Sequence, residues 1–273
     1  MNLAFYSEPY VEPVHLEDAK VHLRGESSIT AEDGAIQAWI TAARQAAEAE
    51  ANVRLVAQTL DLELPCFPAA TAKNPDAAIE LVTPLIAVVS ITYTDENGVA
   101  QTLTSADYQV DDNARPPRLV PAYDEDWPDT RAVPAAVVVR FTCGFARPFT
   151  ALASTGVCTA KGWTPVNGDR FRLCNSGGAL AAGLSTLTDY YIVSASGSTF
   201  KLSLTSGGAA VSISANSVTY DFAGMIPGQI LAGLKLILGD LSLYRENSIS
   251  GAIIAEIPLA AKNLLRAERV WRF

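Results

Sequence analysis

The side chains that could carry acid–base chemistry are few, and the sequence does not group them. The two histidines, His15 and His22, are seven residues apart, in or beside a predicted short helix over Pro13–Leu23. Helical metal ligands are usually three or four residues apart, so this pair is a poor metal site. A Ser-His-Asp or Cys-His arrangement would also have to recruit these two residues. We expect both to be solvated helix residues.

An acidic cluster, Asp124-Glu125-Asp126 with Asp129 nearby, is a second candidate. Its carboxylates could bind Ca²⁺, but it lacks the spaced Asp/Asn ligands and terminal Glu of a known calcium loop, so a solvated acidic loop is expected. The four cysteines form no Cys-x-x-Cys pair, and no Gly-x-x-x-x-Gly-Lys phosphate loop is present. They are Cys66, Cys143, Cys158 and Cys174. The sequence therefore predicts no catalytic residues, no metal and no cofactor.

The composition sets broad limits on the class of protein. With 273 residues, of which 49% are hydrophobic, the chain can form one large domain or two ordinary ones. The net charge of −9 argues against sequence-independent nucleic-acid binding, which depends on Lys and Arg. The N-terminus has no signal-peptide pattern. We expect a soluble protein with reduced cysteines, made in the cytoplasm and without a membrane segment.

Two helices with apolar faces must organise the chain. Asp33 is predicted to cap a helix that ends near Asn52, and a second helix is predicted over Ile226–Glu246. Their apolar positions recur at steps of three and four: Ile36, Ile40, Ala43 and Ala47 in the first, and Ile230, Leu234, Ile237, Leu241 and Tyr244 in the second. The alanines between Ala42 and Ala51 would allow close approach of another helix, either within the fold or from a neighbouring subunit. Gly239 is tolerable if a backbone packs near it.

The remaining chain is mostly β-like. From Thr59 onwards apolar and polar residues alternate, and Asp95–Gly98 is a good hairpin turn between two strands. The segment 149–221 is poor in charge and rich in Gly, Ser and Thr. Its predicted strands are Arg170–Leu173, Tyr190–Val193, Thr199–Leu204 and Ala210–Ile213. We expect an α+β fold in which a helical bundle with an antiparallel β region (1–148 and 222–273) carries an inserted all-β domain (149–221).

Several motifs occur in an order that resembles a known family. They are Pro13–Arg24, the Ile36–Ala51 helix with Gln58-Thr59-Leu60, Ser105–Asp111, Arg118–Pro121, Trp127-Pro128, Val137–Phe145, and Ile257-Pro258-Leu259 followed by Leu264-Leu265. Over roughly residues 11–147 and 223–273 the chain resembles the head-tail connector (adaptor) proteins of tailed bacteriophages, similar to gp6 of phage HK97. The segment 149–221 departs from this family and resembles small β modules of other phage structural proteins.

The resemblance implies a virion protein, assembled in the bacterial host cytoplasm and located at the head-tail interface. It implies a dodecameric ring that binds the portal protein, extends the DNA channel without sequence-specific binding, and offers a site to a stopper or tail-completion protein. The portal-docking end would comprise Arg266, Arg269, Trp271, Arg272 and Phe273. Packing between subunits would use the helix residues Ile36, Ile40, Ala43, Ala47, Ile230, Leu234, Ile237 and Leu241.

Two alternatives stay open. A hydrolase would need a site built around His15, His22 or the cluster at Asp124. A carbohydrate- or protein-binding module could instead lie in the inserted segment, where Trp163, Tyr190 and Tyr191 could offer aromatic stacking faces. Exposed rings at these positions would favour carbohydrate binding.

Overall fold

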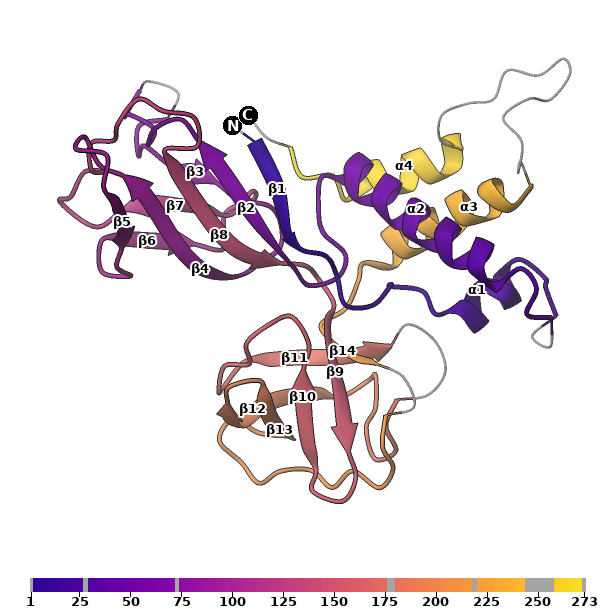
Figure 1. Cartoon of the computed structure of the whole chain (residues 1–273). Coiled ribbons are helices and arrows are strands. Elements are labelled where there is room, and N and C mark those ends of the chain that lie inside the picture. Colours follow the sequence, from indigo (N-terminus) through magenta and orange to yellow (C-terminus); the bar gives the residue numbers. More distant parts are fainter. Residues whose placement is uncertain are drawn as a thin grey trace, which may run out of the picture. The chain divides into compact units, whose positions relative to one another are not determined.

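The computed structural model describes residues 2–26, 29–71, 74–175, 180–217, 220–243 and 258–271. Within these ranges the chain forms four α-helices and fourteen β-strands, and all strand pairs within its sheets are antiparallel (Figure 1). The fold is therefore α+β. By compactness the chain divides into two units, which are Met1–Pro9, Ala57–Gly144 and Val270–Phe273 for the first, and Tyr10–Val56 and Phe145–Arg269 for the second.

The first unit is built on a five-stranded sheet with the strand order β1-β2-β8-β4-β5. These strands are β1 (Asn2–Ser7), β2 (Gln58–Leu64), β8 (Val137–Cys143), β4 (Leu85–Thr94) and β5 (Ala100–Leu103). The predicted alternation is present in β2, where Leu60 and Leu62 are buried in the core. Between them, Asp61 accepts two hydrogen bonds of 2.8 Å from Arg140 on β8. The sheet thus has one apolar face and one polar face.

The predicted hairpin joins β4 to β5. The Oδ1 of Asp95 accepts hydrogen bonds from the N–H groups of Asn97 and Val99, both at 2.9 Å. Gly98 has φ +84°, which glycine adopts without strain. A separate three-stranded sheet, in the order β3-β7-β6, contributes to the same core. Its strands are β3 (Ile79–Glu80), β7 (Arg118–Pro121) and β6 (Tyr108–Asp111).

Four helices belong to the second unit. They are α1 (Leu16–His22), α2 (Asp33–Ala51), α3 (Gly228–Leu243) and α4 (Leu259–Ala267). α3 packs against both α2 and α4, and α1 contacts α2 and α3. The prediction that Asp33 caps α2 is wrong. Glu32 holds the cap position without a side-chain cap bond, and the Asp33 carboxylate instead lies 2.7 Å from the ammonium group of buried Lys20.

Close approach of helix backbones occurs at one glycine of α3, although not at the predicted one. A Cβ on Gly233 would lie 3.0 Å from Leu265 Cγ and 3.4 Å from the carbonyl oxygen of Ala261, both on α4. A Cβ on Gly239 would meet only the His22 ring, at 3.8 Å. The absence of a side chain at Gly233 therefore lets α4 pack directly on α3.

The second unit also contains a closed six-stranded barrel in the order β10-β13-β12-β11-β14-β9 (Figure 1). Its strands are β9 (Arg147–Leu152), β10 (Val157–Ala160), β11 (Arg170–Asn175), β12 (Asp189–Ser196), β13 (Thr199–Ser203) and β14 (Asp221–Ala223). Phe149, Phe200 and Phe222 are at most 1% exposed and fill its interior. The predicted strand Ala210–Ile213 is wrong, since only Ala210 forms an isolated bridge, with Ser203. The domain boundary at 149–221 stays a prediction.

Some sequence-based expectations fall on residues outside the described ranges. The predicted end of the second helix, Tyr244–Glu246, is one of them, and the C-terminal Arg272 and Phe273 are others. Of the helices in the described ranges, none is long and apolar enough to span a bilayer.

Candidate functional site

The predicted subunit-packing residues lie in the interior of the helical region, which we define as α1–α4. Ile36, Ile40, Ala43 and Ala47 of α2 are at most 7% exposed, as are Ile230, Leu234 and Ile237 of α3, and Leu241 is half-buried. Because α2 and α3 pack on each other, these side chains bury one another within a single chain. A role between subunits stays a prediction for them.

Apolar residues on the outer sides of these helices are the better candidates for contact with another molecule. Val21 of α1 is 74% exposed, and Leu236 and Leu243 of α3 are 39% and 77% exposed. His22 and α3 are in contact, because His22 Nε2 lies 2.7 Å from the carbonyl oxygen of Lys235. These exposed positions were not predicted, because the predicted packing residues are those of one apolar face on each helix, and that face is covered by other helices of the same chain.

The C-terminal segment has a charged part and an aromatic part. Arg266 and Arg269 converge on Glu50 of α2, with nitrogen to Oε1 distances of 2.8 and 3.9 Å. Trp271 follows and is 57% exposed. The structure therefore brings together two of the predicted portal-docking arginines and binds them to the chain itself. Arg272 and Phe273 lie outside the described residues.

A buried ion network at the C-terminal half of α2 was not predicted. Arg44 Nε donates to Glu12 at 2.8 Å, and its NH1 donates to Glu48 at 3.1 Å. Glu48 also accepts the N–H of Leu55 at 2.8 Å. Arg44 and Glu48 are only 4% and 3% exposed. The network ties the segment before α1, helix α2 and the segment after α2 together.

The network shifts the pKa values of Glu48 and Arg44. Burial raises the pKa of Glu48, although the positive charge of Arg44 and the Leu55 N–H act in the opposite direction. Burial lowers the pKa of Arg44, but the hydrogen bond to Glu12 and the charge of Glu48 outweigh it and leave that pKa raised. Arg44 therefore remains a cation.

The histidines and the acidic cluster are not arranged as a catalytic site. His15 is the N-cap of α1, where its Nδ1 accepts the N–H of Glu17 at 3.4 Å. His22 is occupied by its contact with α3. Among the residues that the structure describes, no three His, Cys, Asp or Glu side chains are grouped so that they could hold a metal ion.

The aromatic rings considered for carbohydrate stacking are mostly internal to the barrel. Trp163 is 6% exposed, and its indole N–H donates to the carbonyl oxygen of Pro148 at 2.8 Å. Tyr190 is 3% exposed, and its hydroxyl accepts the N–H of Ser185 at 3.0 Å. Tyr191 is half-buried. Two of the three rings therefore offer no exposed face for a sugar.

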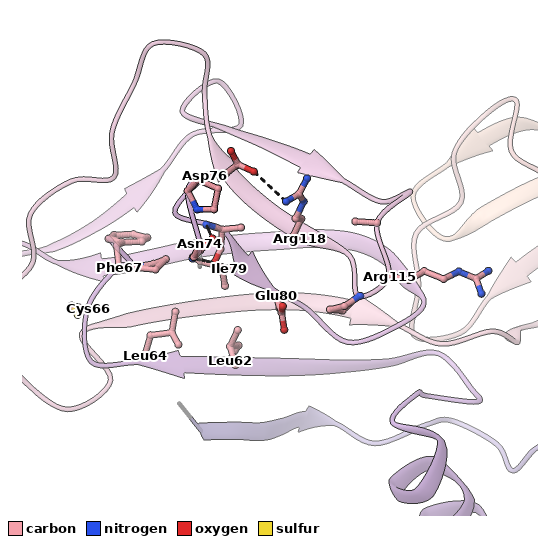
Figure 2. A pocket seen from close by; sticks show the side chains of 15 residues that line it. Leu62, Leu64, Cys66, Phe67, Asn74, Asp76, Ile79, Glu80, Arg115 and Arg118 are labelled. Atoms are coloured by element: carbon pink, nitrogen blue, oxygen red, sulfur yellow. Dashed lines mark hydrogen bonds and ion pairs between the residues drawn. The ribbon is translucent and has the colours of Figure 1, made fainter. Parts of the chain in front are cut away.

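The first unit contains a pocket of about 630 Å³. Leu62 and Leu64 of β2 form one side, and Asp76 and Arg118 lie on the other (Figure 2). Arg118 forms ion pairs with Asp76 at 3.2 Å and Asp111 at 3.0 Å. The pocket therefore has an apolar wall, and the charge of Arg118 is neutralised by two carboxylates. Such a pocket suits the binding of an apolar group.

Comparison with known proteins gives a whole-chain structural likeness. No protein-family model matches the chain, and no curated protein matches its sequence. Similar solved structures include the neck of an empty gene transfer agent particle computed with C6 symmetry (16% identity, TM-score 0.58), the virion of the native particle (15%, 0.58), and the native neck computed with C12 symmetry (14%, 0.56). Each match covers 100% of this chain and 97% of the other. The chain thus shares its fold, over its full length, with chains of gene transfer agent particles.

Proposed function

We propose that the chain is a structural subunit of the neck of a tailed-phage-like particle and has no catalytic role. The observation that carries this proposal is the likeness over 100% of this chain to neck chains of gene transfer agent particles. The order of the sequence motifs, which resembles the adaptor family, supports the same conclusion independently. The likeness spans the barrel segment as well, so that segment is no obstacle to the proposal.

Within that role, we propose an adaptor similar to gp6 of phage HK97, with its helices assembled as a bundle. Its copies would form a ring, of twelve subunits by the family resemblance, that binds the portal protein and receives a stopper or tail-completion protein. A ring repeats one heterologous interface, so each copy needs two different complementary surfaces. The exposed side chains of Val21, Leu236 and Leu243 are suited to one of them.

The C-terminal segment is the proposed portal contact. Glu50 already pairs with Arg266 and Arg269, so these arginines orient the segment, and the exposed ring of Trp271 is the proposed anchor. Genomic DNA would pass through the ring without sequence-specific binding, which the net charge of −9 supports. The assembled protein would lie in the virion after assembly in the host cytoplasm.

The decisive experiment is native mass measurement of the full chain, alone and mixed with its portal ring. A ring, or a monomer that becomes a ring on the portal, is the expected result. Trp271→Ala should weaken portal binding at least tenfold and leave the oligomeric state of the free protein unchanged. Leu187→Ala, which truncates an apolar side chain that is 83% exposed, is the matched control and should have no effect. A monomer indifferent to the portal would contradict the proposal.

A further inference from the structure

Charge is divided unevenly along the chain. The barrel segment 147–223 contains five Lys or Arg residues and three Asp, whereas the rest of the chain contains 15 Lys or Arg and 26 Asp or Glu. The segment 57–144, which forms most of the first unit, holds five cations and 13 carboxylates. One part of the molecule is therefore cationic and another strongly anionic.

Three of the five cations in the barrel segment lie on one outer face. Strand register places Arg170 opposite Tyr191 and Arg172 opposite Asp189, and Lys201 lies on the same side of β13, two residues from the position opposite Tyr191. We call Arg170, Arg172, Tyr191 and Lys201 the basic face. The side chains of Arg170 and Arg172 are 61% and 52% exposed.

The positive charge of the basic face is only partly neutralised by nearby carboxylates. Arg170 and Arg172 share one carboxylate, that of Asp189, at 2.6 and 2.9 Å. Lys201 adds a third cation to this single anion. The shared carboxylate also orders both arginine side chains before any partner arrives, which reduces the entropy lost on binding. Exposed, ordered guanidinium groups recognise carboxylates by paired hydrogen bonds, and the adjacent tyrosine adds an apolar surface.

The first unit presents a surface of the opposite kind. A groove of about 520 Å³ is lined by Asp76, Asp111, Glu125 and Asp126, and by Tyr123, which is 91% exposed. Asp76 and Asp111 bind Arg118, whereas Glu125 and Asp126 are exposed. We call this the acidic groove.

The loop that forms the acidic groove is held in place. Trp127 directly follows it, donates its indole N–H to the carbonyl oxygen of Ala77 at 2.7 Å, and stacks on Phe67 with ring centroids 4.9 Å apart. Its carboxylates are therefore presented on a fixed support, as a docking surface requires.

We propose that the basic face of one copy docks on the acidic groove of the neighbouring copy in the ring. The inference rests on the proposed function and names one of its subunit interfaces. A second copy is the occupant because a heterologous interface needs two complementary patches on every subunit, and this chain carries both. Guanidinium groups from the barrel would pair with Glu125 and Asp126, and Tyr191 would meet Tyr123.

Charge reversal of each side, followed by mixing, tests this interface. Arg170→Glu with Arg172→Glu, and separately Glu125→Lys with Asp126→Lys, should each weaken self-association of the full chain, or ring formation on the portal, at least tenfold. A 1:1 mixture of the two double variants should restore assembly, because reversed faces match when the copies alternate. Assembly of the unmodified chain should also weaken with rising NaCl concentration.

Matched controls keep the net charge change constant. Arg24→Glu with Arg131→Glu, and Glu26→Lys with Glu96→Lys, reverse exposed charges elsewhere and should leave assembly unchanged. Circular dichroism and thermal melting verify that each variant folds. If the unmodified chain forms rings and both reversed variants also do so, or if the mixture fails to recover, the interface is wrong although the ring function stands. If the unmodified chain forms no ring with or without the portal, the proposed function fails instead.

One further outcome would reassign the basic face. Binding of a random-sequence 20-base-pair DNA, lost in Arg170→Glu/Arg172→Glu while ring assembly is unchanged, would overturn the inference in favour of nucleic acid.

Discussion

Glu48 of α2 and Asp221 of β14 are both almost completely buried, with exposed fractions of 3% and 1%, but their surroundings differ. Glu48 has the cation of Arg44 at 3.1 Å and the N–H of Leu55 at 2.8 Å. Among the described residues, the donors to Asp221 are neutral: the hydroxyl of Ser217 at 2.7 Å and the N–H of Ala181 at 3.4 Å. Within the described residues, no cation pairs with Asp221.

The difference shows two ways of burying a carboxylate. In the helical region burial also raises the pKa of Glu48, but the Arg44 cation opposes the change, and Glu48 ties three chain segments together through its bonds to Arg44 and Leu55. In the barrel, burial raises the pKa of Asp221, and the Ser217 and Ala181 hydrogen bonds oppose that change only in part. The barrel therefore favours the protonated acid more strongly than the unfolded chain does.

Removal of the cation beside Glu48 is expected to have the largest effect on stability. Arg44→Met leaves Glu48 buried without its charge partner, and we expect a loss of about 3–5 kcal/mol in the free energy of unfolding at pH 7. Without Arg44 the pKa of Glu48 rises further, so the loss should shrink as the pH falls and Glu48 becomes protonated. Urea unfolding at pH 7 and pH 4.5, with hydrogen exchange of α2 peptides, measures it.

A double variant serves as the control for this prediction. Arg44→Met with Glu48→Leu removes both charges and should recover most of the stability, but about 1–3 kcal/mol should remain lost because the buried N–H of Leu55 then has no Glu48 oxygen to bind. A double variant no more stable than Arg44→Met would contradict the pairing.

Asp221→Asn should have a smaller effect that depends on pH. Because the folded-state pKa of Asp221 is raised, its stabilising contribution is complete below the ordinary pKa and is lost as the pH rises through the folded-state value. Asparagine has no such titration, so the variant should gain stability relative to the wild type between pH 4 and pH 8. Each unit of pKa shift corresponds to about 1.4 kcal/mol.

Asp189→Asn is the matched comparison, and its pH dependence should have the opposite sign. Hydrogen bonds from Arg172 and Arg170 lower the pKa of Asp189, so its contribution is present above the ordinary pKa and is lost as the pH falls through the folded-state value. The variant should therefore fall behind the wild type as the pH rises from 2 to 6. Thermal melts over a series of pH values measure both effects. If the difference in thermal midpoint between variant and wild type changed with pH in the same direction for Asp221→Asn and Asp189→Asn, the distinction between the two carboxylates would be wrong.

The smallest effect is expected on the exposed side of the barrel. Arg170→Ala with Arg172→Ala removes solvent-exposed ion pairs, which contribute little to stability. Differential scanning calorimetry at pH 7 should find the thermal midpoint lowered by no more than in Asp189→Asn, and by far less than in Arg44→Met. A large drop in the midpoint would mean that these arginines support the barrel rather than a partner surface.

Local patterns predicted much of the secondary structure. The steps of three and four in α2 and α3, the alternation in β2 and the hairpin turn at Asn97-Gly98 were sufficient, because each depends on residues close in the sequence. Strand β1 was missed, since Asn2–Ser7 has no two-residue period of burial. Closure of the barrel could not be predicted either, because β9 pairs with β14 across the whole segment between them.

The candidate surfaces were harder to predict than the elements. Periodicity identified an apolar face on α2 and α3 but could not say whether another helix of the same chain covers it. Arg44 and Glu48 lie among the alanines of α2, and their burial depends on Glu12 and Leu55, which are distant in the sequence. The basic face depends on strand register, which the sequence alone does not specify.

The chain enters the barrel on β9 and leaves it on β14, and these strands pair with Arg147 opposite Ala223. Paired strands are about 5 Å apart, so a short turn could join the two ends and leave their flanks undisturbed. The barrel can therefore be removed or replaced without interrupting the fold of the flanking chain. A chain without the barrel would keep that fold but would lose the basic face proposed to contact the neighbouring copy.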